Sequence, residues 1–303
     1  MKLNMRLFLL ITFTFYTTIL FSQKTGLVLS GGGAPGIAHI GVLKALEENE
    51  IPIDYITGTS IGALVGGMYA LGMSSDEMIA FFKSSEFKKW KRIDIRLQKK
   101  TILPYRIINS ETVQQSLEIL TEQAQISSKV NFDSLFVPFR CVASDIHNKR
   151  PYLFSQGNLA TAIRASMSYP FLFEATEVDS LLLFDGGIYN NFPTDIMMQI
   201  FKPDLMIGCI VAYNPPKATS GDIVMQLQNM IVHDTNYEIP DSLGINIKPD
   251  LKAISVFDFS EIDKLVEIGY QQTIQQMDAI RLKINHYRPL SELQHKRLLF
   301  KQK

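Results

Sequence analysis

The chain has 303 residues, 46% of them hydrophobic, which is enough for a large core in one α/β domain or two small ones. Its 30 Lys and Arg residues balance 30 Asp and Glu residues, and this neutral balance argues against nucleic acid as the main partner. The two cysteines, Cys141 and Cys209, lie in apolar runs without metal-ligand spacing, so the sequence predicts neither a metal site nor a disulfide framework.

The first residues are typical of a secretory signal peptide. Lys2 and Arg6 precede an uncharged apolar run, Leu7–Leu20, which is too short to span a bilayer comfortably. We expect cleavage near Ser22 and a periplasmic, outer-membrane-associated or secreted protein; a retained anchor is the alternative. The expected organisation is a signal peptide at 1–22, one folded domain at 23–285 and a basic, fraying tail at 286–303.

Two strand–helix pairs open the folded part. An apolar strand, Gly26–Ser30, ends in glycines and is followed by a helical apolar pattern over Gly36–Asn49. A second short strand, Ile53–Thr57, precedes an apolar helix, Ile61–Gly72. Consecutive strand–turn–helix units imply parallel strands joined by crossover helices.

The rest of the chain continues this alternation. Ser110 is expected to cap one helix, and Ser260 with Asp263 to form a capping box for another. Near-continuous apolar runs suit a sheet that is covered on both faces. Three of them predict further strands: Val137–Ala143, Val178–Phe184 and Leu205–Val211. The predicted fold class is therefore α/β with a mainly parallel central sheet.

Ser60 lies in the sequence GTSIG, between the second predicted strand and its helix. This is G-x-S-x-G in the context where a nucleophilic serine occupies a sharp strand-to-helix turn, and Gly58 and Gly62 avoid collisions there. The free N–H groups and positive dipole end of the following helix would stabilise a negatively charged tetrahedral intermediate. The alternative is an ordinary helix N-cap, a position that also favours serine.

A second glycine-rich turn, SGGGAPG, begins at Ser30. Successive glycines let several N–H groups converge on one anion. The pattern fits an oxyanion hole, and it fits a dinucleotide loop in which Gly31, Gly33 and Gly36 form G-x-G-x-x-G and Asp54 is the acid. A plain tight turn is the structural alternative. The nearby GTSIG favours the oxyanion hole, because it gives the loop a reaction to serve.

Asp185 ends an apolar run and is followed by Gly186 and Gly187, which would let another segment pack against its carboxylate. An aspartate that merely begins a turn is the alternative. The histidines occur in no distinctive motif, so none stands out as a catalytic base: His39, His147, His233, His286 and His295.

Five blocks together resemble the patatin-like phospholipase family, in the family's order, as a bacterial, exported member. They are GLVLSGGGAPGIAHIGVLKALEE, GTSIGALVGGMYA, VASDI, AIRASMSYPFLFEATEV and DGGIYNNFP. The resemblance implies a three-layer α/β/α fold and hydrolysis of acyl esters in lipids. It also implies a Ser60–Asp185 dyad without histidine and an oxyanion hole at Gly31, Gly32 and Gly33, to which we add Ile61 as a further donor. Only the resemblance brings Ser60 and Asp185 together.

One departure and one surface qualify this expectation. Family members commonly carry Arg or Lys where this chain has Pro35, which puts a preference for anionic headgroups in doubt. The segment from Lys83 to Lys100 holds eight basic and two acidic residues, interleaved with Phe87 and Trp90. It suggests contact with an anionic membrane surface, and a solvated segment with inward-facing aromatics is the alternative.

We therefore expect a serine lipid acyl hydrolase of the phospholipase A or lysophospholipase type, acting on a lipid ester without a metal or organic cofactor. Two alternatives remain: a catalytically impaired lipid-binding homologue, in which Pro35 spoils the site, and a nucleotide-binding α/β protein. The oligomeric state is not specified by the sequence.

Overall fold

The computed structural model describes residues 23–90, 93–96, 105–127, 129–170 and 172–302. The expected signal peptide at 1–22 lies outside the described residues, and so do residues 91–92 and 97–100 of the basic segment.

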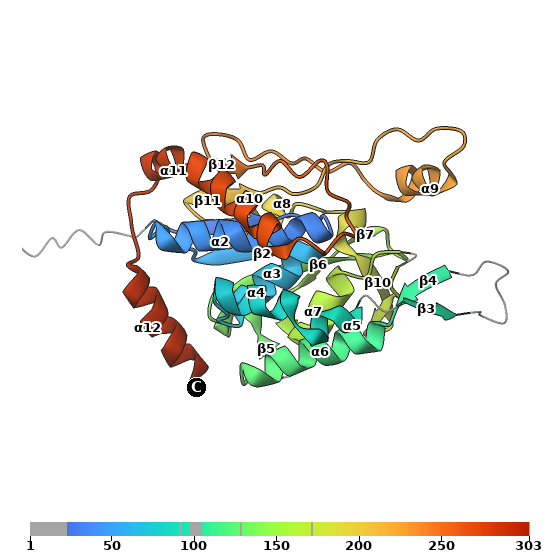
Figure 1. Ribbon diagram of the computed structural model, residues 1–303, viewed down its shortest axis with the longest axis horizontal. Coiled ribbons are helices and arrows are strands. Elements are labelled where there is room, and N and C mark those ends of the chain that lie inside the picture. Colours follow the sequence, from blue (N-terminus) through green and yellow to red (C-terminus); the bar gives the residue numbers. More distant parts are fainter. Residues whose placement is uncertain (1–22, 91–92, 97–104, 128, 171, 303) are drawn as a thin grey trace, which may run out of the picture.

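An eight-stranded sheet forms the centre of the molecule (Figure 1). The strand order is β12-β11-β1-β2-β6-β10-β9, and β7 also pairs with β6. The first five strands of this order run parallel to one another, whereas β7, β9 and β10 are antiparallel to their neighbours. The predicted α/β class with a mainly parallel sheet is confirmed. The strands are β1 (Thr25–Leu29), β2 (Tyr55–Thr59), β6 (Phe139–Asp145), β7 (Arg150–Phe154), β9 (Thr176–Val178), β10 (Leu181–Asp185), β11 (Leu205–Cys209) and β12 (Gly244–Ile247).

Helices cover the sheet, and two small strand pairs lie outside it: β3 (Ile93–Arg96) with β4 (Tyr105–Ile108), and β5 (Val130–Asn131) with β8 (Gln156–Gly157). The α-helices are α2 (Ala38–Glu48), α3 (Ile61–Ala70), α4 (Ser75–Lys83), α5 (Ser85–Trp90), α6 (Ser110–Gln123), α7 (Leu159–Ser166), α8 (Thr194–Ile196), α9 (Ile223–Ile231), α10 (Ile262–Gln275), α11 (Met277–Lys283) and α12 (Leu290–Lys301). Shorter 3₁₀ or π turns are η1 (Ala34–Ile37), η2 (Phe132–Ser134), η3 (Gly186–Ile188) and η4 (Met197–Phe201). No helix in the described ranges is long and apolar enough to cross a membrane.

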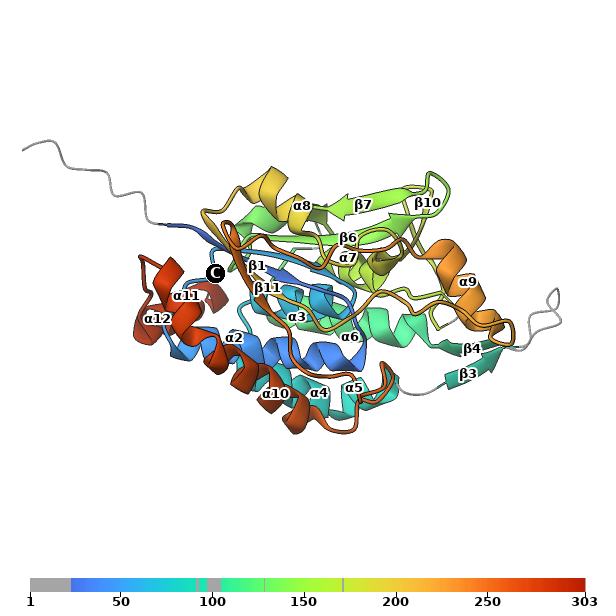
Figure 2. The same ribbon diagram turned by 90° about the horizontal axis from the view of Figure 1, so that it is seen from above.

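The two faces of the sheet are buried in cores of different size. Because side chains alternate along a strand, Leu27 and Leu29 of β1 enter the larger core, whereas Val28 enters a smaller one with Phe192 and Met197. Helices α2, α3 and α7 contribute to the larger core, and η4 packs on β1 and β2 on the other face. Figure 2 shows α8 on one side of the sheet and α2, α3 and α10 on the other.

The sequence predicted one strand at Val178–Phe184, but the structure divides this run between two strands. It holds the end of β9, a turn and most of β10, because Asp179 and Ser180 both adopt positive φ angles (49° and 65°) and reverse the chain. Paired positive φ angles are typical of a type I′ hairpin turn. The reversal matters for function, since it directs β10 towards the end of β2.

Two predicted helix caps are also wrong. Asn109 caps α6 by accepting hydrogen bonds from the N–H groups of Glu111 (3.0 Å) and Thr112 (3.1 Å), and Ser110 is the first helical residue. Ser260 forms no capping box with Asp263, because its hydroxyl donates to Asp258 and α10 begins only at Ile262.

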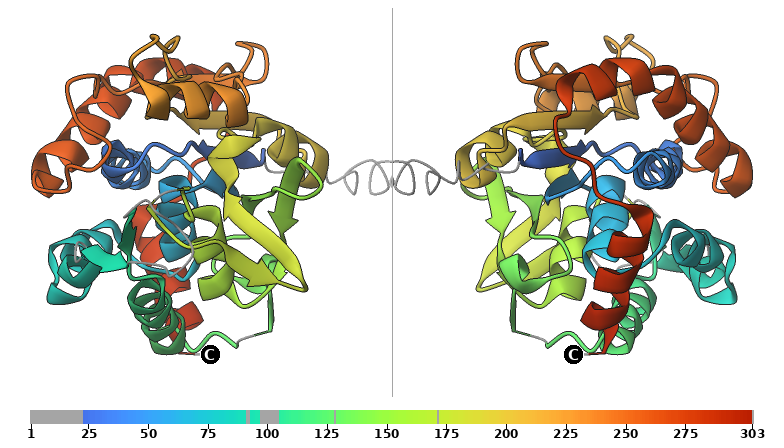
Figure 3. Two further views of the ribbon diagram at one scale, coloured as in Figure 1. Left: turned by 90° about the vertical axis from the view of Figure 1, so that its right-hand side faces the viewer. Right: turned by 90° about the vertical axis from the view of Figure 1, so that its left-hand side faces the viewer.

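The C-terminal segment was expected to fray, but its residues 290–301 form α12. This is the red helix that runs down to the C-terminus in the right-hand view of Figure 3. Its Arg297 is buried and pairs with the buried Glu47 of α2 at 2.5 Å. This ion pair fastens the end of the chain to the core.

Candidate active site

Strands β2 and β10 meet end to end along one edge of β6. β7 occupies the other edge of β6 over Cys141–Asp145, so β2 and β10 share the remaining edge. Along it, β2 pairs with β6 up to Val142, and β10 pairs with β6 from Ala143 to Asp145. Thr59 lies opposite Val142 and Asp185 opposite Ala143. The register therefore places Ser60, one residue beyond β2, beside Asp185 at the end of β10.

Ser60 occupies a strained turn between β2 and α3. Its φ and ψ angles are 55° and −124°, outside the regions that a serine normally prefers. A side chain at Gly58 would lie 2.4 Å from the Gly62 carbonyl oxygen, and one at Gly62 would lie 2.4 Å from the Leu29 oxygen. Both glycines of the G-x-S-x-G sequence are therefore required by close backbone packing, as predicted.

The Ser60 hydroxyl donates a hydrogen bond to Oδ2 of Asp185 at 2.6 Å. The other carboxylate oxygen accepts the N–H of Gly187 at 2.7 Å. Asp185 is only 3% exposed, and burial raises its pKa from 3.8 to about 6, although the hydrogen bonds from Ser60 and Gly187 act to lower it. Near neutral pH the carboxylate is therefore ionised and more basic than an ordinary aspartate.

Gly186 and Gly187 let the chain pass close to this carboxylate. A side chain at Gly186 would lie 2.2 Å from the Val142 carbonyl oxygen, and one at Gly187 would lie 3.0 Å from Asp185 Oδ1. The predicted reason for the two glycines, close packing around Asp185, is thus what the structure shows.

Ser166 supports the serine turn, and the sequence analysis gave it no role. At the end of α7, its hydroxyl accepts the Ser60 N–H at 2.9 Å and donates to the Val142 carbonyl at 2.6 Å. It is completely buried. Its only signal in the sequence was its place inside the block AIRASMSYPFLFEATEV, which contains two serines and does not single out this one.

The glycine-rich loop, which contacts the serine turn at Gly31, has two N–H groups without an acceptor in the described residues. Gly31 does not contribute one, because its N–H donates to the Asn191 carbonyl at 3.1 Å, which corrects the expectation that Gly31 is an oxyanion donor. For Gly32 and Gly33, no acceptor lies within hydrogen-bonding reach in the part of the chain that the structure describes. Gly33 has a φ of 65°, a conformation that favours glycine.

Contacts hold this loop against the serine turn. A side chain at Gly31 would lie 3.1 Å from Ser60 Cβ, and one at Gly36 would lie 2.1 Å from the Ile61 side chain. Ile61 is the first residue of α3, and its N–H is one of the donors that a helix leaves free at its start. Pro35 is buried within η1, so the helical path survives the substitution as expected.

Asn191 joins the glycine loop to the aspartate turn. Its Oδ1 lies 2.2 Å from the position a side chain would take at Gly31 and 2.8 Å from that at Gly187. Its Nδ2 donates to the hydroxyl of Tyr237 at 2.6 Å. Asn191 belongs to the DGGIYNN sequence, but nothing in that sequence indicated which of the two asparagines faces the site.

No histidine hydrogen-bonds to Ser60 or Asp185 within the described ranges. His39 lies under the glycine loop and its Nε2 is 2.9 Å from the Ser30 carbonyl, to which it donates. Burial lowers the pKa of His39 to about 4, so the ring is neutral near pH 7. It supports the loop and is not placed to act as the base.

The dinucleotide alternative is wrong because Asp54 lies at the other end of the sheet. Asp54 precedes β2, whereas the glycine loop follows β1, and the two strands are parallel. Its carboxylate is already bound by the Thr25 N–H at 3.0 Å and by Arg288 at 3.0 Å.

The aromatic residues of the basic segment are not available to a membrane. Phe87 and Trp90 are 4% and 5% exposed and pack against each other and Phe81. Lys83 pairs with Asp263 at 2.5 Å and Lys89 with Glu86 at 2.6 Å. For these two aromatics the inward-facing alternative is the one that the structure shows, and Lys91, Arg92, Lys99 and Lys100 lie outside the described residues.

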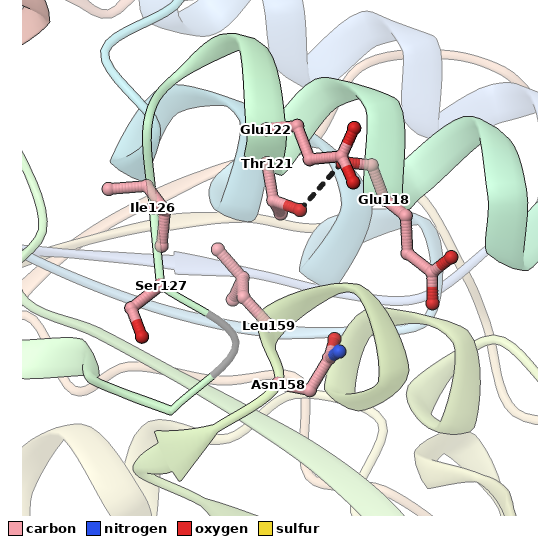
Figure 4. Close-up of a pocket in the computed structure, with 7 residues that line it drawn as sticks. All are labelled: Glu118, Thr121, Glu122, Ile126, Ser127, Asn158 and Leu159. Carbon is pink, nitrogen blue, oxygen red and sulfur yellow. Dashed lines mark hydrogen bonds between the residues drawn. The ribbon is translucent and has the colours of Figure 1, made fainter.

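A separate hollow lies between α6 and α7 (Figure 4). Its volume is about 320 Å³, and it is lined by Glu118, Thr121, Glu122, Ile126, Ser127, Asn158 and Leu159. Neither Ser60 nor Asp185 lines it, so it is not part of the serine site. In the described ranges, no group of three or more His, Cys, Asp or Glu side chains is arranged to hold a metal ion.

A strained serine turn, a buried carboxylate bonded to the serine, and a glycine loop with free N–H groups packed against the serine turn define a nucleophilic-serine site on an α/β fold. Residues 27–198 match the family described as patatin-like phospholipase, and the chain belongs to this family. The family resemblance drawn from the five sequence blocks is thereby confirmed.

Three known proteins illustrate the relationship. A patatin-like phospholipase domain-containing protein of Caenorhabditis elegans is 35% identical over 60% of this chain and 13% of its own length. The lysophospholipase NTE1 of Mycosarcoma maydis is 34% identical over 60% of this chain and 9% of its own length. The crystal structure of VipD from Legionella pneumophila shares the fold, with a TM-score of 0.50 and 15% identity over 85% of this chain and 67% of VipD. The chain thus spans less than half the length of the curated relatives it matches.

Proposed function

We propose that this protein is a lipid acyl hydrolase that uses Ser60 as nucleophile and Asp185 as base. The observation that carries the proposal is the 2.6 Å hydrogen bond between these two side chains at the junction of β2 and β10. A serine hydroxyl is a weak nucleophile until a neighbouring base accepts its proton, and the raised pKa of Asp185, about 6, suits that task.

The reaction follows from the positions of these groups. As Ser60 Oγ attacks the ester carbonyl, its proton passes to Asp185 Oδ2. Collapse of the tetrahedral intermediate breaks the bond to the alcohol, which leaves with that proton, and an acyl-serine remains. Asp185 then takes a proton from water, the resulting hydroxide equivalent attacks the acyl carbonyl, and Ser60 recovers its proton as the acid leaves.

The N–H groups of Gly32 and Gly33, with that of Ile61, are the proposed donors to the oxyanion. Since these groups are fixed before the substrate binds, they stabilise developing charge without reorganisation. Loss of one such donor typically costs about 10²–10³ in kcat.

The substrate class is proposed from the relatives. Two of the relatives described above bear the names phospholipase and lysophospholipase, so we propose a lipid carboxylic ester as the substrate. The site needs no metal or organic cofactor for this chemistry.

Labelling with a fluorophosphonate tests the proposal. The wild-type chain is expected to be labelled at Ser60 and the Ser60→Ala variant to remain unlabelled, with Ser180→Ala, in the exposed β9–β10 turn, as the matched control. Asp185→Asn should slow labelling by about 10²–10⁴, the usual contribution of a general base. An unlabelled wild-type chain would instead support the catalytically impaired lipid-binding protein, and loss of activity in His233→Ala equal to that in Ser60→Ala would indicate a histidine-dependent triad.

We also propose that residues 1–22 direct export, on the basis of Lys2, Arg6 and the apolar run that follows. Sequencing the N-terminus of protein recovered from outside the cytoplasm tests this proposal. A mature end near Gln23 is expected, and recovery only of the uncleaved chain inside the cell would contradict it.

A basic surface at Lys83–Lys100 remains a separate proposal for anionic membranes, supported by the excess of basic residues. Lys88→Glu with Lys89→Glu should weaken binding to anionic vesicles, and the wild-type binding should weaken in salt. Vesicle binding that is unaffected by both the charge reversal and the added salt would show that this segment does not bind the membrane.

A further inference from the structure

Helix α9 exposes apolar side chains along one stripe. Its residues Ile223, Leu227, Met230 and Ile231 are 69%, 40%, 82% and 38% exposed. Their spacing of i, i+4, i+7 and i+8 places them on a single face of the helix. Such a stripe normally packs against a core, so its exposure here indicates a binding surface.

The helix carries no charged residue, since its sequence is IVMQLQNMI. Asp222 caps its start by accepting the Met225 N–H at 2.9 Å. A partner attracted by opposite charge would require charged side chains on this face. The uncharged stripe fits a partner that contributes apolar surface, such as the acyl region of a neutral lipid layer.

The segment that carries α9 begins and ends at the serine site. At its start, the Val211 N–H donates to the Ser30 hydroxyl at 2.9 Å, and a side chain at Gly32 would lie 2.9 Å from the Val211 oxygen. At its end, the Tyr237 hydroxyl accepts from Asn191 at 2.6 Å. The excursion therefore leaves from the glycine loop and returns beside the aspartate turn.

Two further hydrogen bonds join the α9 segment to the surroundings of Asp185. The Gln228 amide donates to the hydroxyl of Tyr169, and the preceding residue, Ser168, accepts the Asp185 N–H with its carbonyl. Just beyond α9, the His233 N–H donates to the Ile188 carbonyl at 2.8 Å. The exposed stripe is thus held in a fixed relation to the dyad.

A second exposed apolar pair lies at the glycine loop. Val256 and Phe257 are 46% and 61% exposed. The Val256 carbonyl accepts the Ala34 N–H at 2.8 Å, and a side chain at Gly33 would lie 2.3 Å from that carbonyl oxygen. Two separate segments therefore expose apolar side chains where they contact the loops of the site.

We propose that α9, together with Val256 and Phe257, forms the surface by which this protein docks on a neutral lipid layer. The choice of a lipid partner rests on the proposed function, because an ester buried among acyl chains must be reached at the surface of the layer that holds it. Docking buries the exposed apolar side chains, which supplies the binding free energy without charge attraction.

The test measures binding of the full chain to phosphatidylcholine vesicles in a Ser60→Ala background, so that no result depends on hydrolysis. Leu227→Asp with Met230→Asp is expected to lower the partition coefficient at least about tenfold, since each change prevents the burial of one large apolar side chain. The matched control is Leu282→Asp with Leu298→Asp, two leucines that are 88% and 60% exposed on α11 and α12. In Figure 1 these helices lie at the opposite end of the molecule from α9, and the control should bind as the parent does.

Raising the salt from about 0.1 M to about 0.5 M should leave the binding unchanged, which separates this surface from a basic one. Met230→Asp alone, at the most exposed of the four positions, should lower binding in the same direction, and circular dichroism checks that each variant is folded. Equal losses in the α9 and control pairs, or no binding by the parent, would overturn the proposal. So would light scattering that shows the α9 pair converting a dimer to a monomer without changing vesicle binding, because a second copy would then cover the stripe. The hydrolase proposal fails separately, through absence of fluorophosphonate labelling.

Discussion

Asp185→Asn is expected to abolish activity and, at neutral pH, to make the folded protein more resistant to unfolding. Asp185 is 3% exposed, and burial raises the pKa of its carboxyl group from 3.8 to about 6 despite the hydrogen bonds from Ser60 and Gly187. Keeping a buried carboxylate ionised costs free energy, which the protein accepts because the ionised form is the base. An asparagine has nearly the same shape and no charge to desolvate.

The pKa gives the size and sign of this cost. Because the pKa is higher in the folded chain, the folded state binds the proton more tightly than the unfolded state does. The stability that this proton contributes is therefore complete below about pH 3.8, falls as the pH rises, and is lost above about pH 6. The change from 3.8 to about 6 corresponds to about 3 kcal/mol.

Urea unfolding of the wild-type chain and Asp185→Asn, at intervals between about pH 4 and about pH 8, measures this cost. The free energy of unfolding of the variant, relative to wild type, should rise by about 2.5 kcal/mol over that range, mostly below about pH 6.5, because a small part of the total of about 3 kcal/mol is already lost at about pH 4. Other titrating groups are common to both proteins and cancel in the difference. Asp179→Asn, at an exposed position in the β9–β10 turn, should follow the wild type. Parallel curves for wild type and Asp185→Asn would refute the reasoning that Asp185 is a desolvated base.

Three further changes test other parts of the site and the fold. Ser166→Ala should lower kcat about tenfold with little change in KM, because the Ser60 turn loses its hydrogen bond, and Ser166→Thr should restore part of it; a change in KM alone would argue against a positioning role. Gly33→Ala should lower kcat at least about tenfold, because the added side chain would collide with the Val256 carbonyl oxygen and displace the loop. The control is Gly157→Ala, which also has a positive φ but adds its side chain in open space. Equal activity of the two variants would contradict the oxyanion role of the glycine loop. Arg297→Met should lower the urea-measured stability by about 3 kcal/mol, because it leaves the carboxylate of Glu47 buried without its partner; a loss below about 1 kcal/mol, the size of an exposed pair, would show that α12 is not fastened there.

The sequence was sufficient for the local units of the fold. The strands at β1, β2 and β11 and the helices that follow β1 and β2 were predicted because each is a continuous segment with its own apolar pattern, and glycine-rich turns follow β1 and β2. Ser60 stood out for the same reason, since Gly58 and Gly62 lie within two residues of it. The hairpin between β9 and β10 was missed because its turn, Asp179 and Ser180, contains no glycine or proline to interrupt an apolar run.

Contacts between distant segments were beyond the sequence. Ser60 and Asp185 are 125 residues apart, and only the family resemblance joined them, since periodicity says nothing about which strand ends meet. The availability of the N–H groups in the glycine loop was equally hidden. Gly31, Gly32 and Gly33 look alike in the sequence, and it is the carbonyl of Asn191, far along the chain, that engages the first and leaves the other two free.

The junction of β2 and β10 explains why the polar site can exist inside an apolar sheet. Where one strand follows another along the edge of β6, the ladder of backbone hydrogen bonds is interrupted, and buried polar groups there must find other partners. Ser166 meets this need by donating to the Val142 carbonyl, and the same hydroxyl then accepts the Ser60 N–H and fixes the strained turn. The break in the sheet therefore creates the demand for a buried hydroxyl, and that hydroxyl positions the nucleophile. A continuous strand across this edge would satisfy the backbone by itself, and it would leave no place for Ser60 and Asp185 to meet.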